Sequence, residues 1–409
     1  MTISKQKQKK LTPTISVVKT KYEVTVVLPC LNEAETLETC ITKAQNSLTD
    51  LGVSGEVVVA DNGSTDGSQD IANKLKARVV SVETRGYGSA LLAGFKAANS
   101  KYIIMGDADD SYSLDQLGPF VGALRNGADL VMGNRFAGTI HPGAMPWLHR
   151  YVGNPVLSFL GRLFFRGHIR DFHCGMRGLN REKILQLDLH TTGMEFASEL
   201  IVKSILANHS IVEVPTDLKP DGRSREPHLR TWRDGWRHLR FLLSYSPRWL
   251  FYYPGLLLAI LGLTGFVSLI GNPRESFGIV FDLQSLIFST FVLLCGTQMI
   301  WFAVLSKASS VSKGFMPKDH RWDRIFGLAQ YERIYIIYFI VICIGLILLG
   351  LQVDEWISQS FGSLNPSSVV RNSLLGGSLV FLGFQALISH FLLSIILLGT
   401  EKVSIKIES

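Results

Sequence analysis

Residues 101–111 read KYIIMGDADDS, an apolar run that ends in a group of carboxylates. A short run rich in β-branched and aromatic residues is typical of a strand. Asp107 and Asp109 stand two positions apart after it, so both can reach one hard cation such as Mg²⁺ or Mn²⁺. Ser113 and Gln116 have the spacing of a capping box, which predicts a helix that starts at Ser113. The stretch therefore predicts a strand, an acidic metal-binding turn and a helix.

Four more strands are predicted near it, from the runs VTVVLP (24–29), EVVVAD (56–61), ARVVSV (77–82) and ADLVMGN (128–134). Apolar strands that alternate with helical stretches predict an α/β domain with a mainly parallel sheet covered on both faces. Ligands bind such sheets at the carboxyl ends of the strands, so the polar residues there are candidate binding residues. They are Asn32, Glu33, residues 61–66, 85–89 and 107–111, Asn134 and Arg135.

The second predicted strand ends in the polar turn DNGSTDG, residues 61–67. A carboxylate such as that of Asp61 can accept hydrogen bonds from the edge of a base or from a ribose hydroxyl. The same residues also favour an ordinary helix cap. With PCLNE (29–33) after the first strand and Asp107 after the fourth, polar turns follow three strands, and we expect them to meet in one crevice.

Beyond Arg248 the chain contains four stretches without Asp, Glu, Lys or Arg, at residues 249–271, 283–306, 334–353 and 372–400. Each has the roughly 20 apolar residues that a helix needs to cross a bilayer. The mean hydropathy of +0.22 is high for a soluble protein. Four buried helices of a large soluble core are the alternative interpretation. The pattern favours a four-span membrane domain over residues 249–400, with a tail at 401–409.

Basic residues are unevenly divided between the predicted spans. Six follow the second span, namely Lys307, Lys313, Lys318, Arg321, Arg324 and Arg333. Only Arg274 follows the first span and only Arg371 the third. The basic N-terminal segment, residues 1–20, lacks the apolar run of a secretory signal. The positive-inside rule therefore predicts that the first domain, the basic loop and the C-terminus face the cytoplasm.

Residues 227–248 are predicted to form an amphipathic juxtamembrane helix. Trp232, Trp236, Leu239 and Leu243 are spaced to share one stripe, and Arg230, Arg233, Arg237 and Arg240 fall on a neighbouring face. Such a helix can lie in a membrane interface, next to the first span. The alternative is a solvated helix packed against its own domain.

The net charge of +7 does not indicate a nucleic-acid partner, because the basic residues gather beside the membrane segments. An anionic lipid bilayer is the expected partner. Five scattered cysteines predict neither a disulfide framework nor a cysteine metal site. A group of arginines between the sheet and the membrane can bind phosphate oxygens in bidentate fashion, although any single one can be an ordinary surface residue. The group is Arg135, Arg150, Arg162, Arg166, Arg170 and Arg177.

The polar turns at 29–33, 61–67 and 107–109 resemble those of the family 2 glycosyltransferases of the GT-A fold, whose sheet is Rossmann-like. Three later stretches, GNRF (133–136), DFHCGMRG (171–178) and EVP (213–215), are similar to the polyprenyl-phosphate sugar synthases. Dolichol-phosphate mannose and glucose synthases belong to that group. The resemblance covers residues 23–226, which sets the catalytic domain at 21–226. A four-span tail is similar to that of the membrane-embedded bacterial members.

The resemblance implies roles for particular residues. Asp107 and Asp109 would bind Mg²⁺ or Mn²⁺ and the donor diphosphate, and both would be catalytic together with Arg135 and Arg177. Further donor contacts would come from Pro29, Leu31, Glu33, Asp61, Asn62 and Ala108. Arg135, Arg150 and Arg177 would bind the acceptor phosphate. Two departures from the family pattern leave individual contacts open: Asn62 replaces a usual Asp, and Asp110-Ser111 replaces a frequent Leu-Gln pair.

The implied reaction is inverting transfer of a hexose, glucose or mannose, from a UDP- or GDP-hexose to a dolichyl or undecaprenyl phosphate. It would take place at the cytoplasmic face of a bacterial inner membrane or an equivalent membrane, and a homo-oligomer is compatible with it. A family 2 enzyme that acts on a hydroxyl acceptor, such as a glycolipid or polysaccharide, is one alternative. A non-catalytic membrane scaffold is another. A Rossmann dehydrogenase is disfavoured because the first strand is not followed by G-x-G-x-x-G.

Overall fold

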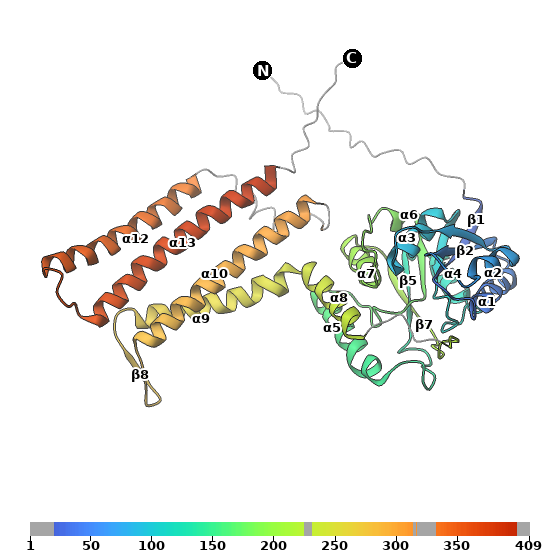
Figure 1. Cartoon of the computed structure of the whole chain (residues 1–409), viewed down its shortest axis with the longest axis horizontal. Coiled ribbons are helices and arrows are strands. Elements are labelled where there is room, and N and C mark those ends of the chain that lie inside the picture. The colour runs from blue at the N-terminus through green and yellow to red at the C-terminus, as the bar shows by residue number, and fades with distance from the viewer. Residues whose placement is uncertain (1–19, 225–230, 314–315, 317–332, 399–409) are drawn as a thin grey trace, which may run out of the picture. The chain divides into compact units, whose positions relative to one another are not determined.

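The computed structural model describes residues 20–224, 231–313, 316 and 333–398. The chain divides into two compact units (Figure 1). The sheet unit comprises residues 1–155, 169–200 and 209–228, and the helical unit comprises residues 156–168, 201–208 and 229–409. The sequence predicts one continuous domain over residues 21–226, whereas this division groups two of its inner segments with the helical unit.

The sheet unit contains a seven-stranded sheet in the order β3-β2-β1-β4-β6-β5-β7. The strands are β1 (Tyr22–Cys30), β2 (Gly55–Asp61), β3 (Arg78–Ser81), β4 (Ser100–Met105), β5 (Leu130–Asn134), β6 (Arg177–Asn180) and β7 (Ile211–Pro215). All neighbouring pairs are parallel except those of β6, which runs antiparallel to β4 and β5. The mainly parallel sheet and its five predicted strands are confirmed. The β-branched pattern missed β6, since its sequence RGLN contains no such residue.

Helices cover both faces of the sheet. Alternate residues of β1, Val24, Val26 and Leu28, belong to a buried cluster that also contains apolar residues of α1 (Leu37–Asp50), α2 (Ser68–Lys74) and α4 (Gly118–Arg125). On the opposite face, Gly94 of α3 (Tyr87–Ala97) packs closely against Val27. Two short helices, α6 (Arg181–Leu185) and α7 (Phe196–Leu206), follow β6. The strands β1, β2, β4 and β5 are therefore mostly buried, as expected for a sheet covered on both faces, whereas β3 and β7 are more exposed.

The capping box predicted at Ser113 is wrong. Gln116 only closes a turn there, with its N–H donating to the carbonyl oxygen of Ser113 at 3.0 Å. The helix α4 begins at Gly118, and Pro119 occupies its first turn. Proline favours this position because it lacks the N–H that would be unpaired there.

The helical unit contains four helices that are long and apolar enough to cross a membrane. They are Arg248–Leu269, which combines the π-helical turn η2 (Arg248–Tyr252) with α9 (Tyr253–Leu269), then α10 (Leu283–Ser312), α12 (Arg333–Ser358) and α13 (Pro366–Leu398). A short hairpin of β8 (Arg274–Ser276) and β9 (Ile279–Phe281) joins α9 to α10. The predicted four-helix membrane domain is confirmed. Most of the predicted basic loop between α10 and α12, like the segment 1–19 and the tail 401–409, lies outside the described residues.

The amphipathic helix is α8 (Thr231–Ser244). It buries Asp234, His238, Phe241 and Leu242 within the helical unit. Its Phe241 and Leu242 pack against the apolar residues Leu157, Leu160 and Phe164 of α5 (Asn154–Phe165). Trp232 and Trp236 instead remain 82% and 60% exposed. The helix thus packs on its own unit through one face and exposes tryptophan on another, and its place in a membrane interface stays a prediction.

Glycines let neighbouring membrane helices approach closely. A Cβ added to Gly262 of α9 would collide with the backbone nitrogen of Leu293 on α10, and one added to Gly296 of α10 would collide with Ala259. A Cβ at Gly345 of α12 would lie 2.7 Å from the carbonyl oxygen of Gly376 on α13. Small residues at helix interfaces are the usual solution in lipid, where close packing replaces the hydrophobic effect. The helices α9 and α10, and likewise α12 and α13, therefore pack backbone against backbone.

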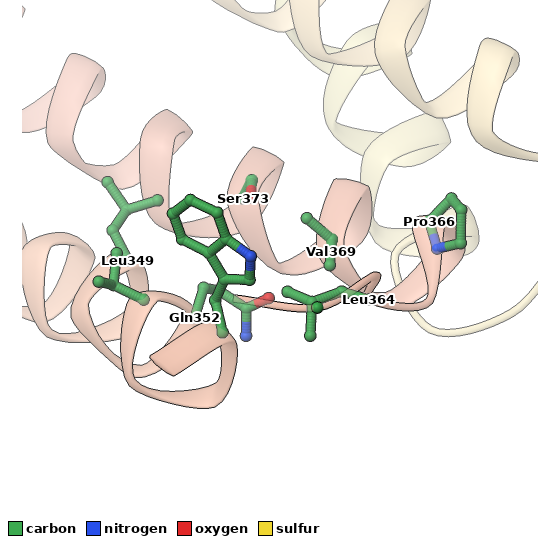
Figure 2. A pocket seen from close by; sticks show the side chains of 9 residues that line it. Leu349, Gln352, Leu364, Pro366, Val369 and Ser373 are labelled. Carbon is green, nitrogen blue, oxygen red and sulfur yellow. The ribbon is translucent and has the colours of Figure 1, made fainter. Parts of the chain in front are cut away.

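A pocket of about 440 Å³ lies where α12 ends and α13 begins. Figure 2 shows Leu349 and Gln352 of α12 facing Val369 and Ser373 of α13 across it. None of its lining residues is charged. The lining of the pocket accordingly offers no charged group to a phosphate or a metal ion.

Candidate active site

The loops that follow β1 and β2 are bound to each other. Asn32 adopts the left-handed conformation (φ 59°), and its side-chain oxygen accepts a hydrogen bond from the N–H of Thr65 at 2.8 Å. The carboxylate of Asp66 accepts one from Ala34 N–H at 2.9 Å. The N–H of Glu33 donates to the Ser68 hydroxyl at 3.0 Å. The structure therefore brings together residues 29–33 and the DNGSTDG turn, as the sequence predicts.

The side chains of Asp61 and Asn62 are both buried and hold their own loops. Asp61 accepts hydrogen bonds from the N–H groups of Gly63 and Ser64 at 3.2 Å and from the Gln69 amide at 2.7 Å. The Asn62 amide donates to the carbonyl oxygens of Val82 and Thr84, and its oxygen accepts from Gly86 N–H at 2.6 Å. A carboxylate could not donate these two bonds. This explains why asparagine replaces the usual aspartate at position 62.

Asp107 follows β4 and lies partly buried at the carboxyl edge of the sheet. One of its oxygens accepts a hydrogen bond from the Tyr87 hydroxyl, at the start of α3, at 2.9 Å. Burial, and then the negative charge of Asp109, raises the pKa of Asp107 to about 6. The site therefore holds two carboxylates close enough to repel each other, a charge pattern that a cation relieves.

Asp109 is oriented by its own loop. One oxygen accepts hydrogen bonds from the Ser111 hydroxyl at 2.6 Å and from the Ser111 N–H at 3.0 Å. The carbonyl oxygen of Ala108 accepts the Thr36 hydroxyl at 2.6 Å. Asp110 forms an ion pair with Lys43 of α1 at 2.6 Å. The pair Asp110-Ser111 therefore supports the acidic turn, which gives a structural reason for that departure from the family pattern.

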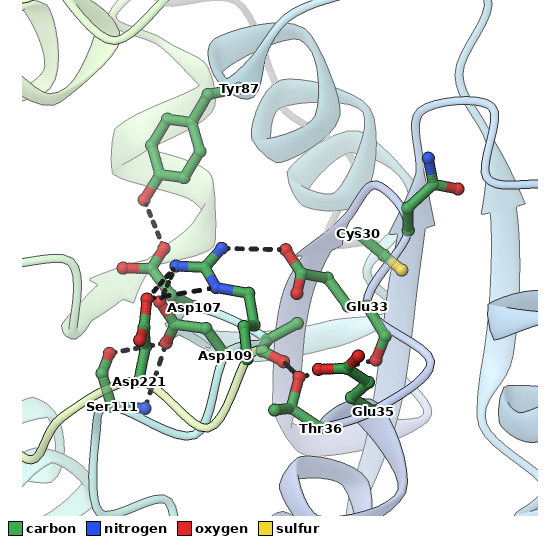
Figure 3. A network of polar contacts seen from close by, with 12 residues as sticks. Cys30, Glu33, Glu35, Thr36, Tyr87, Asp107, Asp109, Ser111 and Asp221 are labelled. Carbon is green, nitrogen blue, oxygen red and sulfur yellow. Dashed lines mark hydrogen bonds and ion pairs between the residues drawn. The ribbon is translucent and has the colours of Figure 1, made fainter. Parts of the chain in front are cut away.

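Arg223 is the residue of this site that the sequence analysis missed. It follows β7 in the short segment 219–224, and its guanidinium donates to Glu33 at 3.1 Å, to Asp109 at 2.8 Å and to Asp221 at 2.9 Å. Figure 3 shows these three carboxylates and that of Asp107 in one group. No sequence spacing links residue 223 to the turns at 33 and 109. β7 is an edge strand of the sheet, and the segment after it reaches the site through a bridge between Leu218 and Tyr112 and a hydrogen bond from Gly222 N–H to the carbonyl oxygen of Asp109.

Arg135 forms a buried ion pair. Its Nε and Nη2 atoms donate to the carboxylate of Asp171 at 2.7 and 2.8 Å, and its backbone N–H donates to the same carboxylate at 3.1 Å. Burial alone would raise the pKa of Asp171, but the Arg135 charge and these hydrogen bonds hold that pKa below its usual range. Burial and then the charge of Arg135 lower the pKa of His149.

Arg177 and Arg150 differ from each other in their surroundings. Arg177 is fully buried, and its guanidinium donates to the carbonyl oxygens of Phe172, Cys174 and Ala197 at 2.8 to 3.1 Å. Arg177 is therefore not observed at the predicted position beside a charged head group, because its guanidinium is hydrogen-bonded to these carbonyl groups inside the sheet unit. Arg150, in the π-helical turn η1 (His149–Gly153), lies over the ring of Tyr151 at 5.5 Å.

The donor set at β4 fits a hard divalent cation. Asp107 and Asp109 supply carboxylate oxygens, which Mg²⁺ and Mn²⁺ prefer. A cationic group, the guanidinium of Arg223, already contacts Asp109. The described residues contain no cluster of three or more His, Cys, Asp or Glu side chains suited to a metal. The two carboxylates would supply few of the oxygens that such a cation coordinates, which would leave positions for a ligand diphosphate.

Comparisons with known proteins bear on the identity of this chain. A family model for "Glycosyl transferase family 2" matches residues 25–187, and one for the "Glycosyltransferase family 2 C-terminal transmembrane region" matches residues 304–397. The low-salt glycan biosynthesis hexosyltransferase Agl6 of Haloferax volcanii is 36% identical over 374 residues, which cover 90% of this chain and 88% of the relative. The chain belongs to glycosyltransferase family 2. It is accordingly a membrane protein and a glycosyltransferase with a GT-A-like domain.

Two further matches are a curated relative and a solved structure. A dolichyl-phosphate hexose transferase of Haloferax volcanii is 33% identical and covers 39% of this chain and 68% of the relative. A crystal structure of glucosyl-3-phosphoglycerate synthase from Mycobacterium tuberculosis, in complex with Mn²⁺, uridine diphosphate and glucosyl-3-phosphoglycerate, aligns with a TM-score of 0.44. It is 24% identical and covers 56% of this chain and 81% of that one.

Proposed function

We propose that this glycosyltransferase moves a hexose, glucose or mannose, from a UDP- or GDP-hexose to a polyprenyl phosphate, with inversion at the anomeric carbon. The observation that carries the proposal is the gathering of Glu33, Asp107 and Asp109 at the carboxyl edge of the sheet, in a chain that continues into four membrane-length helices. The names of the similar hexosyltransferases support the choice of donor and acceptor class.

The donor is bound by the loops after β1, β2 and β4. Pro29, Leu31 and Glu33 form one wall, and Asp61 with Asn62 fixes the shape of the next. Asp107 and Asp109, with Ala108 between them, face the diphosphate and hold the Mg²⁺ or Mn²⁺. When bound, the cation neutralises the charge that develops on the leaving diphosphate. The Tyr87 hydroxyl, 2.9 Å from Asp107, keeps that carboxylate oriented.

The acceptor supplies its own nucleophile. A phosphate monoester has a second pKa of about 6, so one of its oxygens is already an anion at neutral pH. It attacks the anomeric carbon from the face opposite the diphosphate, the bond to the diphosphate breaks, and no protein base is needed. The contribution of the protein is positioning and electrostatic stabilisation.

Three arginines serve the acceptor in different ways. We assign direct contact with the lipid phosphate to Arg150, whose guanidinium lies over an aromatic ring. Arg135 adds positive charge to the acceptor site while it pairs with Asp171. Arg177 acts from the interior, by fixing the carbonyl groups of Phe172 and Cys174.

The active site is proposed to face the cytoplasm, with α8 in the membrane interface. The two exposed tryptophans of α8 suit that position, and α8 leads into the first membrane helix. The Lys and Arg residues between α10 and α12 support the same orientation. In intact cells, a reagent that cannot cross the membrane should label a cysteine placed at Ser276 or Ser363 and should not label one placed at Lys313. The reverse pattern contradicts this topology.

The function is tested with detergent-purified protein and a panel of UDP- and GDP-hexoses. Each donor is offered with polyprenyl phosphate or with the same polyprenol without phosphate, and lipid products are identified by mass. We expect product only from the phosphate, and none in excess EDTA. Equal use of the free alcohol would favour a hydroxyl acceptor, and no transfer from any donor would leave the scaffold alternative.

A further inference from the structure

The segment 219–224 lies across the acidic site like a strap. Lys219 N–H donates to the carbonyl oxygen of Ser111 at 2.9 Å, and Gly222 N–H donates to the carbonyl oxygen of Asp109 at 2.9 Å. At its far end, the N–H and hydroxyl of Ser224 donate to the carboxylate of Glu35 at 2.7 and 2.5 Å. The strap is thus fastened to the loops after both β1 and β4.

The strap places one side chain, Arg223, among the carboxylates. Four acidic groups surround the site, and the guanidinium contacts three of them, Glu33, Asp109 and Asp221 (Figure 3). The side chains of Arg223 and Glu33 are 11% and 7% exposed, so this charge is shielded from water. Shielded charges interact more strongly than surface charges. The one Asp109 oxygen that Ser111 does not engage is the oxygen that Arg223 contacts.

We propose that Arg223 is the resident counter-cation of this site. It pairs with Asp109 and Glu33 when no nucleotide sugar is bound, and it is displaced when a divalent cation and a nucleoside diphosphate bind together. The proposal rests on the function proposed above. A divalent cation alone would have to remove a guanidinium from a shielded carboxylate, so it should bind weakly. A diphosphate offers the displaced guanidinium an anionic partner, so metal and nucleotide should strengthen each other's binding by the same factor.

The test is a Mn²⁺ titration of the full chain in detergent, with free Mn²⁺ counted by electron paramagnetic resonance. In Arg223→Gln, Mn²⁺ without nucleotide should bind about tenfold more tightly than in wild type, which is about 1.4 kcal/mol. The tightening caused by saturating UDP or GDP should shrink by the same factor. Arg223→Lys, which keeps the charge but loses the fork, should stay closer to wild type.

Lys43→Gln is the matched control. Lys43 pairs with Asp110 of the same acidic turn, so this variant removes one positive charge without releasing Asp109. Its Mn²⁺ affinity should stay within about twofold of wild type, on the scale of a partly exposed ion pair. Glu35→Gln loosens the strap while all four site carboxylates remain, and should tighten Mn²⁺ binding by less than Arg223→Gln. If Arg223→Gln lowers the Tm, the Mn²⁺ affinity of Glu35→Gln tests the same proposal in a second variant.

The outcomes separate the two proposals. If wild type binds Mn²⁺ with UDP or GDP and Arg223→Gln and Glu35→Gln bind Mn²⁺ alone no more tightly, the counter-cation role is overturned and the proposed function stands. If Lys43→Gln tightens binding as much as Arg223→Gln, the effect is one of net charge and the role is again overturned. If wild type binds no Mn²⁺ even with either nucleotide, the metal-assisted function fails and the inference fails with it.

Discussion

Arg135 and Arg223 both pair with carboxylates in the sheet unit, but their surroundings differ. Arg135 directs two charged hydrogen bonds at Asp171, which is 0% exposed and also accepts N–H groups of Arg135 and His173. Arg223 divides its contacts among Glu33, Asp109 and Asp221, whose exposures are 7%, 14% and 29%. The first is a pair with one fully buried carboxylate, and the second is a cluster of three partly exposed carboxylates at a sheet edge.

The difference predicts what each cluster contributes. Removing one partner of a buried pair leaves an uncompensated charge and destabilises the fold strongly. In the cluster around Arg223, the guanidinium keeps two acceptors when one is lost. The comparison therefore assigns stability to Arg135 with Asp171, and function to the carboxylates around Arg223.

The largest expected effect is on activity, from Asp109→Asn. The variant should lose at least about 100-fold in transfer rate, the scale of one preorganised electrostatic contact, because a metal-binding charge is removed. Its Tm should stay close to that of wild type, since no core contact is lost. The measurement is initial rate with nucleotide sugar and lipid phosphate, beside thermal unfolding. A variant as active as wild type, or activity that survives excess EDTA, would contradict the function assigned to the carboxylates around Arg223.

The next effect is on stability, from Asp171→Asn. Losing the charge opposite a buried guanidinium should lower the free energy of unfolding by about 3–5 kcal/mol. The matched control is Glu23→Gln, since Glu23 pairs with Arg125 by an equally short fork, 2.6 and 2.8 Å, but at the surface. That change should cost less than about 1 kcal/mol. Urea unfolding of the detergent-solubilised chain distinguishes them, and equal losses would contradict the role given to burial.

The same pair predicts a pH dependence. The folded pKa of Asp171 is lowered, so its contribution is fully present above the unfolded value of about 3.9 and is lost as pH falls through the folded pKa. Asp171→Asn should remove this part of the acid dependence. Unfolding curves of both proteins at a series of acidic pH values are the measurement. Parallel pH profiles would show that Asp171 does not titrate as its surroundings imply.

A third arginine sharpens the comparison, because Arg150 lies over an aromatic ring. Arg150→Gln should raise the KM for polyprenyl phosphate about tenfold, the value of a charged hydrogen bond, and should leave the KM for nucleotide sugar unchanged. The control is Arg162→Gln, on α5 of the helical unit. Two saturation series, one for each substrate, give the answer. A change confined to the donor KM would exclude Arg150 from the acceptor site.

The smallest expected effect concerns α8, where Arg233 and Arg237 pair with the buried Asp234 while Trp236 is exposed. A polarity-sensitive fluorophore on a cysteine placed at Trp236 should shift to the blue when the protein moves from detergent into nanodiscs with anionic lipid. The same fluorophore at the exposed Lys74, on α2 of the sheet unit, should not shift. Identical spectra at both positions would contradict an interfacial α8.

The sequence predicted the sheet, its strands β1 to β5 and the four membrane helices, because each depends on a local pattern, but β7 (Ile211–Pro215) was not predicted although it carries such a pattern. It did not predict β6, whose residues have no strand pattern and pair only because β4 and β5 flank them. The capping box at Ser113 failed for a similar reason, since Pro119 gave a better helix start a few residues later. Elements that form because of their neighbours in space cannot be predicted from the periodicity of their own residues.

The candidate site shows the same division. The turns that contain Glu33, Asp61 and Asp109 could be found from strand ends, and they lie on one edge. Arg177 could not be distinguished from a ligand-binding arginine, because the carbonyl groups that surround it come from three separate positions. Arg223 could not be found at all, since it reaches the site from the far end of the sheet unit's sequence.

The glycine contacts of the membrane helices have a consequence for biogenesis. The helices α9 and α10 are adjacent in the chain and close on each other through Gly262 and Gly296, and α12 closes on α13 through Gly345. Each pair is a hairpin whose partners are synthesised one after the other. Pairing in the bilayer requires only that the second helix of a hairpin has been inserted. The membrane domain can therefore assemble as two successive hairpins during translation, and a methyl group at Gly262 would interrupt the first of them.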